Sequence, residues 1–395
     1  MIKFVAKTGI IVGLTAATLG CAQFKELVQK ESHQKTFAMD KKWVRSTLLT
    51  DYLKFRVLHR FQPILFKDMV IQGNAVDGII AYDRKTGQKI WKKKIENGVE
   101  SGAVIHGNDL FFAAGDGYFH SVNVYNGKTN WVFPIRSEGT GTPMVHDGIV
   151  YFISGNNIAY ALDITSGRQV WLYNRRSTTM LSIRGGSQPS VYKNQVLLGF
   201  NDGFLVSLDQ KKGLMKWQKK LNSKKRFTDI DARPIVLDDR IYVASFDEAL
   251  YCLDANTGQQ IWRYDEGGYA AVSIDEDRVY FSTTQYNIVA LDKSSGKKIW
   301  NYASENGYLT QPQLYKSTVV VGESDGALLA LDAQSGKKLG DFFPGRGVTS
   351  SAAIDNESGD LFFISKEANL YHFLQTRLEE TVGGIWYFRF VSGCY

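Results

Sequence analysis

The chain has 395 residues, of which 44% are hydrophobic and 13% aromatic, and its formal net charge is +7. This composition is sufficient for a large packed core, and the three cysteines imply no disulfide framework. Basic and aromatic residues are not interleaved as in a nucleic-acid-binding protein. Short basic clusters are expected to be solvated strand and loop faces, with attraction to an anionic membrane or an acidic partner as the alternative. These clusters are Lys92–Lys94, Lys219–Lys220 and Lys224–Arg226.

Residues 1–20 have the features of a secretory signal peptide. Two lysines precede an apolar stretch, Gly9–Thr18, that is too short to span a bilayer. Leu19-Gly20-Cys21 then resembles the lipobox of bacterial lipoproteins, in which the cysteine is lipidated. We therefore predict removal of residues 1–20, a lipid on Cys21 and a tether over residues 21–40. The alternative is an unmodified cysteine in an ordinary secretory signal.

A motif with a period of about 40 residues dominates the rest of the chain. In seven successive stretches an Asp or Asn is followed four residues later by Gly, and in six of them Trp follows four residues after the Gly. The tryptophans are 40, 40, 46, 45 and 38 residues apart: Trp91, Trp131, Trp171, Trp217, Trp262 and Trp300. The seventh copy, Asp332/Gly336, has Gly340 in place of Trp.

Each repeat predicts four short antiparallel strands, as the segment from Gly148 to Asn174 illustrates. Runs of β-branched and aromatic residues alternate there with tight turns. The Asp of each motif can accept backbone N–H bonds in its turn, and the Gly supplies a residue with positive φ. Four strands every 40 residues predict one propeller blade, in which Trp lies against the neighbouring blade.

We predict an all-β fold, an eight-bladed β-propeller with four-stranded antiparallel blades, over residues 41–375. The first strands are expected to begin near Gln62, Ser101, Thr140, Ser187, Ala232, Ala270, Gln311 and Ser350. The eighth blade has no clear fourth strand of its own. Lys41–Arg45 resembles Lys89–Lys93, so we predict that the N-terminal segment, with Trp43, closes the ring and removes an open sheet edge.

The rival for ring closure is Ile385–Phe390, which is also strand-like and carries Trp386. It belongs to residues 376–395, a tail whose structure and role the sequence does not indicate. Cys252, between Tyr251 and Leu253, is predicted to be a packed core thiol.

The repeat is irregular in two consecutive places. From each Trp to the next Asp or Asn the distances are 32, 32, 38, 37, 30 and 32 residues. The extra residues are predicted to fall in two loops between blades, at 174–187 and 219–231. Loops of this type share one face of a propeller, and long loops often carry binding sites.

The two loops contain residues typical of an interface. The first has Leu181, Ile183 and Arg184, and the second has Asp229 and Asp231. Arginine beside apolar side chains is characteristic of the centre of protein interfaces. The alternative is internal, with Arg184 and the two carboxylates satisfying each other.

The repeats resemble those of quinoprotein-like eight-bladed propellers. The loop motifs Leu181-Ser182-Ile183-Arg184-Gly185 and Asp229-Ile230-Asp231-x-x-Pro234 are similar to loops of the BamB family, lipoproteins of the outer-membrane β-barrel assembly machinery. The resemblance covers about residues 40–375. It implies that Leu181, Ile183, Arg184, Asp229 and Asp231 contact the periplasmic POTRA domains of BamA. Ala22 rather than Asp after the cysteine implies release to the outer membrane, with the protein on its periplasmic side.

These features are compatible with three functions. The first is a non-catalytic scaffold of the assembly machinery, without cofactor, metal or small-molecule substrate. The second is a quinoprotein dehydrogenase. The resemblance to that class implies a longer chain with adjacent cysteines and a Ca²⁺ site. This chain has no Cys-Cys pair, and its six histidines lack metal-binding spacing. The third is an adaptor for another periplasmic partner that binds the same face.

Overall fold

The computed structural model describes residues 36–48, 59–139, 141–175, 186–222, 228–246 and 248–378, with side chains from residue 39 to residue 375. Residues 38–376 form one compact unit. Within the described residues the secondary structure consists of 32 strands and contains no helix. No helix able to cross a bilayer occurs in that part of the chain.

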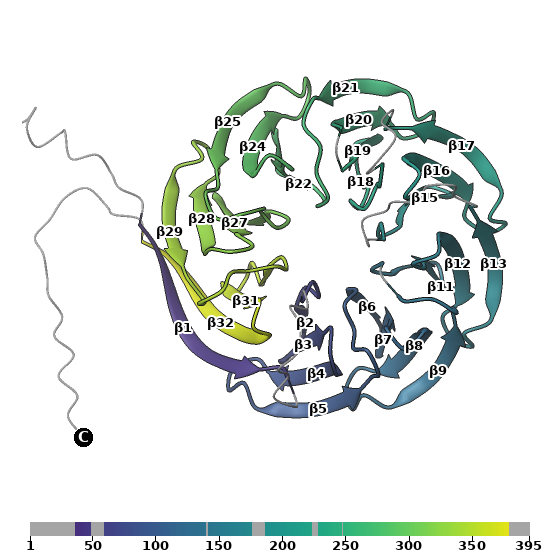
Figure 1. The fold of residues 1–395 in the computed structure, drawn as a ribbon, viewed down its shortest axis with the longest axis horizontal. Helices are drawn as coiled ribbons and strands as arrows, with labels where there is room; N and C mark the ends of the chain where they lie inside the picture. The colour runs from purple at the N-terminus through teal and green to yellow at the C-terminus, as the bar shows by residue number, and fades with distance from the viewer. Residues whose placement is uncertain are drawn as a thin grey trace, which may run out of the picture. The chain divides into compact units, whose positions relative to one another are not determined.

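The strands form eight four-stranded sheets, which surround a central axis as the blades of a propeller (Figure 1). Blade 1 contains β2 (Ile64–Phe66), β3 (Met69–Asn74), β4 (Gly78–Asp83) and β5 (Lys89–Lys94). Blade 2 contains β6 (Ala103–His106), β7 (Asp109–Ala113), β8 (Tyr118–Asn123) and β9 (Thr129–Pro134). Blade 3 contains β10 (Met144–His146), β11 (Ile149–Ile153), β12 (Ile158–Asp163) and β13 (Gln169–Asn174). Blade 4 contains β14 (Ser190–Tyr192), β15 (Gln195–Gly199), β16 (Phe204–Asp209) and β17 (Met215–Lys220).

The remaining blades continue the pattern. Blade 5 contains β18 (Ile235–Leu237), β19 (Arg240–Ala244), β20 (Leu250–Asp254) and β21 (Gln260–Tyr264). Blade 6 contains β22 (Ser273–Ile274), β23 (Arg278–Ser282), β24 (Asn287–Asp292) and β25 (Lys298–Ala303). Blade 7 contains β26 (Gln313–Tyr315), β27 (Thr318–Gly322), β28 (Leu328–Asp332) and β29 (Lys338–Phe342). Blade 8 contains β30 (Ala353–Ile354), β31 (Asp360–Ile364), β32 (Asn369–Leu378) and β1 (Thr36–Ser46).

The Asp-x-x-x-Gly motif forms the turn between the third and fourth strands of a blade. In blade 1, Asp83 Oδ1 accepts hydrogen bonds from the N–H and the hydroxyl of Thr86, both at 2.7 Å. Gly87 follows at φ 65°, a backbone conformation that favours glycine. This glycine also receives the tryptophan of the preceding blade, because a Cβ at Gly87 would lie 2.8 Å from the ring of Trp43.

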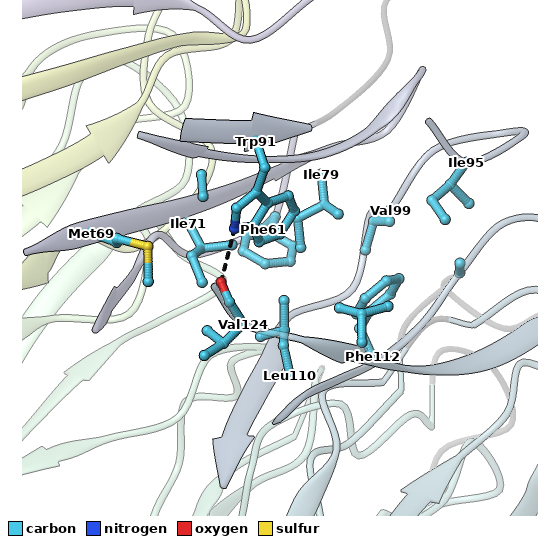
Figure 2. Packing of buried hydrophobic residues seen from close by; sticks show 13 residues of the cluster. Phe61, Met69, Ile71, Ile79, Trp91, Ile95, Val99, Leu110, Phe112 and Val124 are labelled. Carbon is cyan, nitrogen blue, oxygen red and sulfur yellow. Dashed lines mark hydrogen bonds between the residues drawn. The ribbon is translucent and has the colours of Figure 1, made fainter. Parts of the chain in front are cut away.

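The tryptophans join each blade to the next. Trp91 in β5 donates its indole N–H to the carbonyl of Val124 in blade 2 at 2.8 Å, as Figure 2 shows, within a core cluster shared by the two blades. Equivalent bonds to the residue after the next motif's Asp or Asn are made by Trp43, Trp131, Trp171, Trp262 and Trp300. Trp217 differs, since it donates to Gln195 Oε1 in its own blade. The predicted role of tryptophan as a wedge between blades is confirmed.

Ring closure by the N-terminal segment is also confirmed. The sheet order of blade 8 is β1-β32-β31-β30, so β1 supplies the outer strand (Figure 1). Trp43 is 7% exposed, donates to the Arg84 carbonyl at 2.9 Å and packs edge-on against His372 in β32. Arg84 in turn bridges Asp355 and Asp360 of blade 8 at 2.6 and 3.0 Å. The rival segment with Trp386 lies outside the described residues.

The structure explains why Gly340 replaces the seventh tryptophan. Because the outer strand of blade 8 comes from the other end of the chain, β32 continues to Leu378 where the other blades form their Asp-x-x-x-Gly turn. A tryptophan at Gly340 would therefore have no turn glycine to pack against. Phe342 fills this junction instead, with its ring centroid 4.7 Å from that of Phe373.

Candidate partner-binding loops

Two long connections leave the same face of adjacent blades, as the sequence predicts. The first long loop, residues 175–189, links β13 to β14, and the second long loop, residues 221–234, links β17 to β18. Both lie slightly further along the chain than predicted. The structure describes the two ends of each loop, residues 175 and 186–189 in the first and residues 221–222 and 228–234 in the second.

Arg175 fixes the start of the first long loop. Its Nε atom donates to Asp202 Oδ2 at 2.5 Å, and one terminal nitrogen donates to Gln218 Oε1 at 3.0 Å. The guanidinium also lies 4.3 Å from the ring centroid of Phe204, within cation–π distance. Since the side chains of Arg175 and Asp202 are only 13% and 18% exposed, this ion pair holds the loop start against blade 4.

The second long loop is anchored by hydrogen bonds to the backbone on both sides. Thr228 Oγ1 donates to the Asn201 carbonyl at 2.7 Å, and Ile230 N donates to the Phe200 carbonyl at 3.2 Å. On the other side, Phe246 N donates to the Asp229 carbonyl at 3.0 Å. These contacts attach the Asp229–Asp231 segment to turns in blades 4 and 5.

The two loops are joined directly. Ser187 Oγ, at the end of the first loop, donates to the Ala232 carbonyl in the second loop at 3.0 Å. Ser190 Oγ donates to the Pro234 carbonyl at 2.5 Å, and Arg233 Nε donates to Ser190 Oγ at 3.2 Å. Both Ser187 and Ser190 are buried, so the ends of the two loops form one ordered unit.

The paired carboxylates occupy different environments. The Asp229 side chain is fully buried, whereas Asp231 is half-buried. Burial, and then the neighbouring negative charge of Asp229, raise the pKa of Asp231 to about 8, although Arg60 opposes the shift. Asp231 therefore retains a proton over much of the pH range in which ordinary carboxyl groups are ionised.

The predicted site residues fall into two groups. Asp229 and Asp231 lie together at the anchored end of the second loop. Leu181, Ile183, Arg184 and the predicted lipidation site Cys21 lie outside the described residues. Their roles, and the contact between Arg184 and the carboxylates, stay predictions. Sequence reasoning missed Arg175 and Arg60, because neither occupies a repeated position or a motif.

Metal-binding groups and the cysteine thiol are relevant to the alternative of an enzymatic function. Among the described residues, no group of three or more His, Cys, Asp or Glu side chains is placed to hold a metal ion. Cys252 is completely buried, and burial raises the pKa of its thiol to about 11, as suits a packed core residue.

The amino-acid sequence matches a family described as "Outer membrane protein assembly factor BamB", over residues 76–302 and 247–339. These ranges together cover more than half of the chain. The chain belongs to the BamB family.

Individual BamB relatives agree with this assignment. The chain is 29% identical over 345 residues to BamB of Pseudomonas aeruginosa, covering 85% of this chain and 90% of that protein. It is 27% identical over 330 residues to BamB of Escherichia coli K12, covering 78% of this chain and 83% of that protein.

Solved structures give the same fold. The crystal structure of BamB from Moraxella catarrhalis matches with a TM-score of 0.72 and 22% identity, covering 85% of this chain and all of that one. A quinohemoprotein alcohol dehydrogenase from Comamonas testosteroni matches with a TM-score of 0.68 and 14% identity, covering 91% of this chain and 79% of that one. At such low identities these likenesses concern the propeller fold alone and assign no dehydrogenase activity to this BamB-family chain.

Proposed function

We propose that this protein is a non-catalytic scaffold lipoprotein of the outer-membrane β-barrel assembly machinery. It binds the periplasmic POTRA domains of BamA, the barrel subunit, through the two long loops. Membership of the BamB family supports the general role, and the loop motifs support the choice of face. A lipid on Cys21 holds the protein at the periplasmic surface of the outer membrane.

The direct connection of the two loops carries this proposal. The bond from Ser187 to the Ala232 carbonyl ties together the segments that bear the two motifs. A partner that contacts the first loop therefore also meets the anchored Asp229–Asp231 segment. Such fixed ends reduce the entropy lost when the loops bind, which favours a specific interface.

The individual residues have different proposed roles. Leu181 and Ile183 supply apolar contacts, and Arg184 supplies charge-assisted hydrogen bonds to the partner. Asp229 is fully buried and therefore acts by holding the loop rather than by touching the partner. Asp231, which is half-buried, shapes the electrostatics at the base of the same loop.

Charge reversal at Arg184 tests the proposal. Arg184→Glu should weaken association with the barrel subunit by over about 2 kcal/mol, roughly thirtyfold, because it places a repulsive charge in the interface. The measurement is co-purification from solubilised outer membranes. The matched controls are Lys92→Glu and Lys298→Glu, on exposed positions of β5 and β25, which should associate as the wild type does. Normal recovery of the barrel subunit with a folded, lipidated Arg184→Glu protein would refute this interface.

The anchor is tested separately. Cys21→Ser should leave the propeller folded but release the protein from membranes, because the acyl chains that would hold it there are lost. Membrane fractionation and mass spectrometry of the mature wild-type protein provide the measurements. An unmodified Cys21 in the mature protein would contradict the anchor.

A further inference from the structure

Positive charge is concentrated on two neighbouring outer strands, β1 of blade 8 and β5 of blade 1 (Figure 1). β1 contains three Lys or Arg residues and β5 contains four, and Asp40 is the single acidic residue of the two strands. Every other pair of neighbouring outer strands carries four basic residues or fewer. We call the seven residues of β1 and β5 the basic rim: Lys41, Lys42, Arg45, Lys89, Lys92, Lys93 and Lys94.

The basic rim is accessible and largely uncompensated. Lys93 is half-buried, and the other six side chains are exposed. Among the described residues, the one ion pair that the rim forms joins Lys42 to Asp40 at 2.5 Å. The cation of β29, in contrast, has a carboxylate on its own strand, since Lys338 pairs with Asp341 at 2.8 Å. The basic rim therefore keeps a net positive charge, which attracts anionic surfaces.

The chain places this rim near the predicted lipid anchor. β1 begins at Thr36, which is 15 positions after Cys21, and a chain segment of that length reaches at most about 50 Å. The two long loops join blade 3 to blade 4 and blade 4 to blade 5, on the opposite side of the ring (Figure 1). A membrane at the basic rim therefore leaves the long loops accessible to a partner.

We propose that the basic rim binds the anionic phospholipid headgroups of the membrane that holds the lipid on Cys21. This inference rests on the proposed function and adds a second attachment to the anchor. A lipid together with a basic patch holds a protein stably on a membrane, because each cation near an anionic surface adds to the attraction. An acidic protein would meet the same charges, but the tether gives the headgroups a high effective concentration at the rim.

Lysine footprinting of the full-length, lipidated protein tests the proposal. The protein is anchored in vesicles of phosphatidylcholine, with or without phosphatidylglycerol, and treated with an uncharged, water-soluble acylating reagent. Acylation of two reporter lysines in the rim, Lys41 and Lys89, should be at least about threefold slower on the anionic vesicles, because bound headgroups cover them. Lys219 and Lys220 of β17, on the far side of the ring, should react equally on both. Salt at about 1 M should abolish the protection, since it shortens the Debye length to about 3 Å.

Two charge-reversal variants locate the contact. Lys93 and Lys94 are the second and third residues after the tryptophan of β5, and Lys219 and Lys220 hold the same places in β17 with the same exposure classes. Lys93→Glu/Lys94→Glu should raise acylation of the reporter lysines on anionic vesicles to the rate seen on phosphatidylcholine. Lys219→Glu/Lys220→Glu changes the net charge equally and should leave the protection intact.

The outcomes separate this inference from the proposed function. Both variants should co-purify the barrel subunit as the wild type does, because the docking loops belong to blades 3, 4 and 5. Unprotected reporter lysines in an anchored protein that still recovers the barrel subunit would overturn the rim proposal alone, as would equal effects of the two variants. Protection by native outer membranes but not by anionic vesicles would overturn it in favour of an acidic protein. Release of the wild type from the vesicles would contradict both the rim contact and the anchor.

Discussion

Individual tryptophans and glycines set the geometry of this ring. A Cβ on the turn glycine Gly336 would lie 2.6 Å from the ring of Trp300, so no residue larger than glycine fits at position 336. Trp300 is 9% exposed and donates to the Ala333 carbonyl. Trp217 occupies the same place in blade 4 but is more exposed and bonds within its own blade.

Trp300→Ala should therefore cost about 3–5 kcal/mol of unfolding free energy, because it leaves a cavity between two blades. Trp217→Ala should cost less, since part of its ring already contacts solvent and no bond between blades is lost. Urea unfolding monitored by circular dichroism gives both values. Equal losses for the two variants would mean that burial at the blade junction does not determine the effect.

Asp231 makes stability depend on pH in an unusual direction. Its folded pKa of about 8 is above its value in the unfolded chain, which is near 4. Between these values the folded protein holds a proton that the unfolded chain has released. The contribution of Asp231 to unfolding free energy therefore falls as pH rises from about 4 to 8.

Asp231→Asn should remove this pH dependence. The melting temperature of the variant should therefore exceed that of the wild type at pH 8.5, and the difference should be much smaller at pH 5. Thermal unfolding of both proteins at the two pH values is the measurement. Asp292→Asn is the control, because turn hydrogen bonds lower the pKa of Asp292 to about 2 and its titration is complete well below pH 5. A wild-type-minus-variant difference that stays constant with pH would contradict the assignment.

At the scale of the elements, turn chemistry and the tryptophan period predicted most of the strands. The first strands begin two to four residues later than predicted, because the residues before them belong to the connections between blades. For example, β2 begins at Ile64 rather than Gln62. The missing tryptophan at Gly340 was visible in the sequence, but its cause was not. It follows from the pairing of β1 with β32, two segments more than 300 residues apart.

β1 should contribute stability to the whole ring, because it covers the edge of β32 and places Trp43 against blade 1. Deleting residues 41–48 should lower the melting temperature and promote self-association through the newly exposed edge. Differential scanning calorimetry and light scattering provide the measurements. An unchanged melting temperature would show that this strand is dispensable for closure.

At the scale of the whole molecule, the sequence predicted the eight-bladed ring and the face that carries the long loops. The sequence could not predict which contacts hold the ends of the two long loops in place. The ion pair of Arg175 with Asp202 and the bond of Ser187 to Ala232 join residues of consecutive blades, and the influence of Arg60 on Asp231 joins residues far apart in the chain. The side chains that make these contacts are not part of the Asp-x-x-x-Gly-x-x-x-Trp motif, and loops between blades vary independently of the strands that fix the fold.

We propose that this propeller is a lipid-anchored scaffold docked on the barrel subunit of the assembly machinery. The most direct measurement is the identity of the membrane proteins that co-purify with the full-length, lipidated wild-type protein from solubilised outer membranes. We expect recovery of the barrel subunit BamA, in an amount that falls sharply with Arg184→Glu but not with Lys298→Glu. Recovery of a different partner, or of none, from a folded and membrane-bound protein would contradict it.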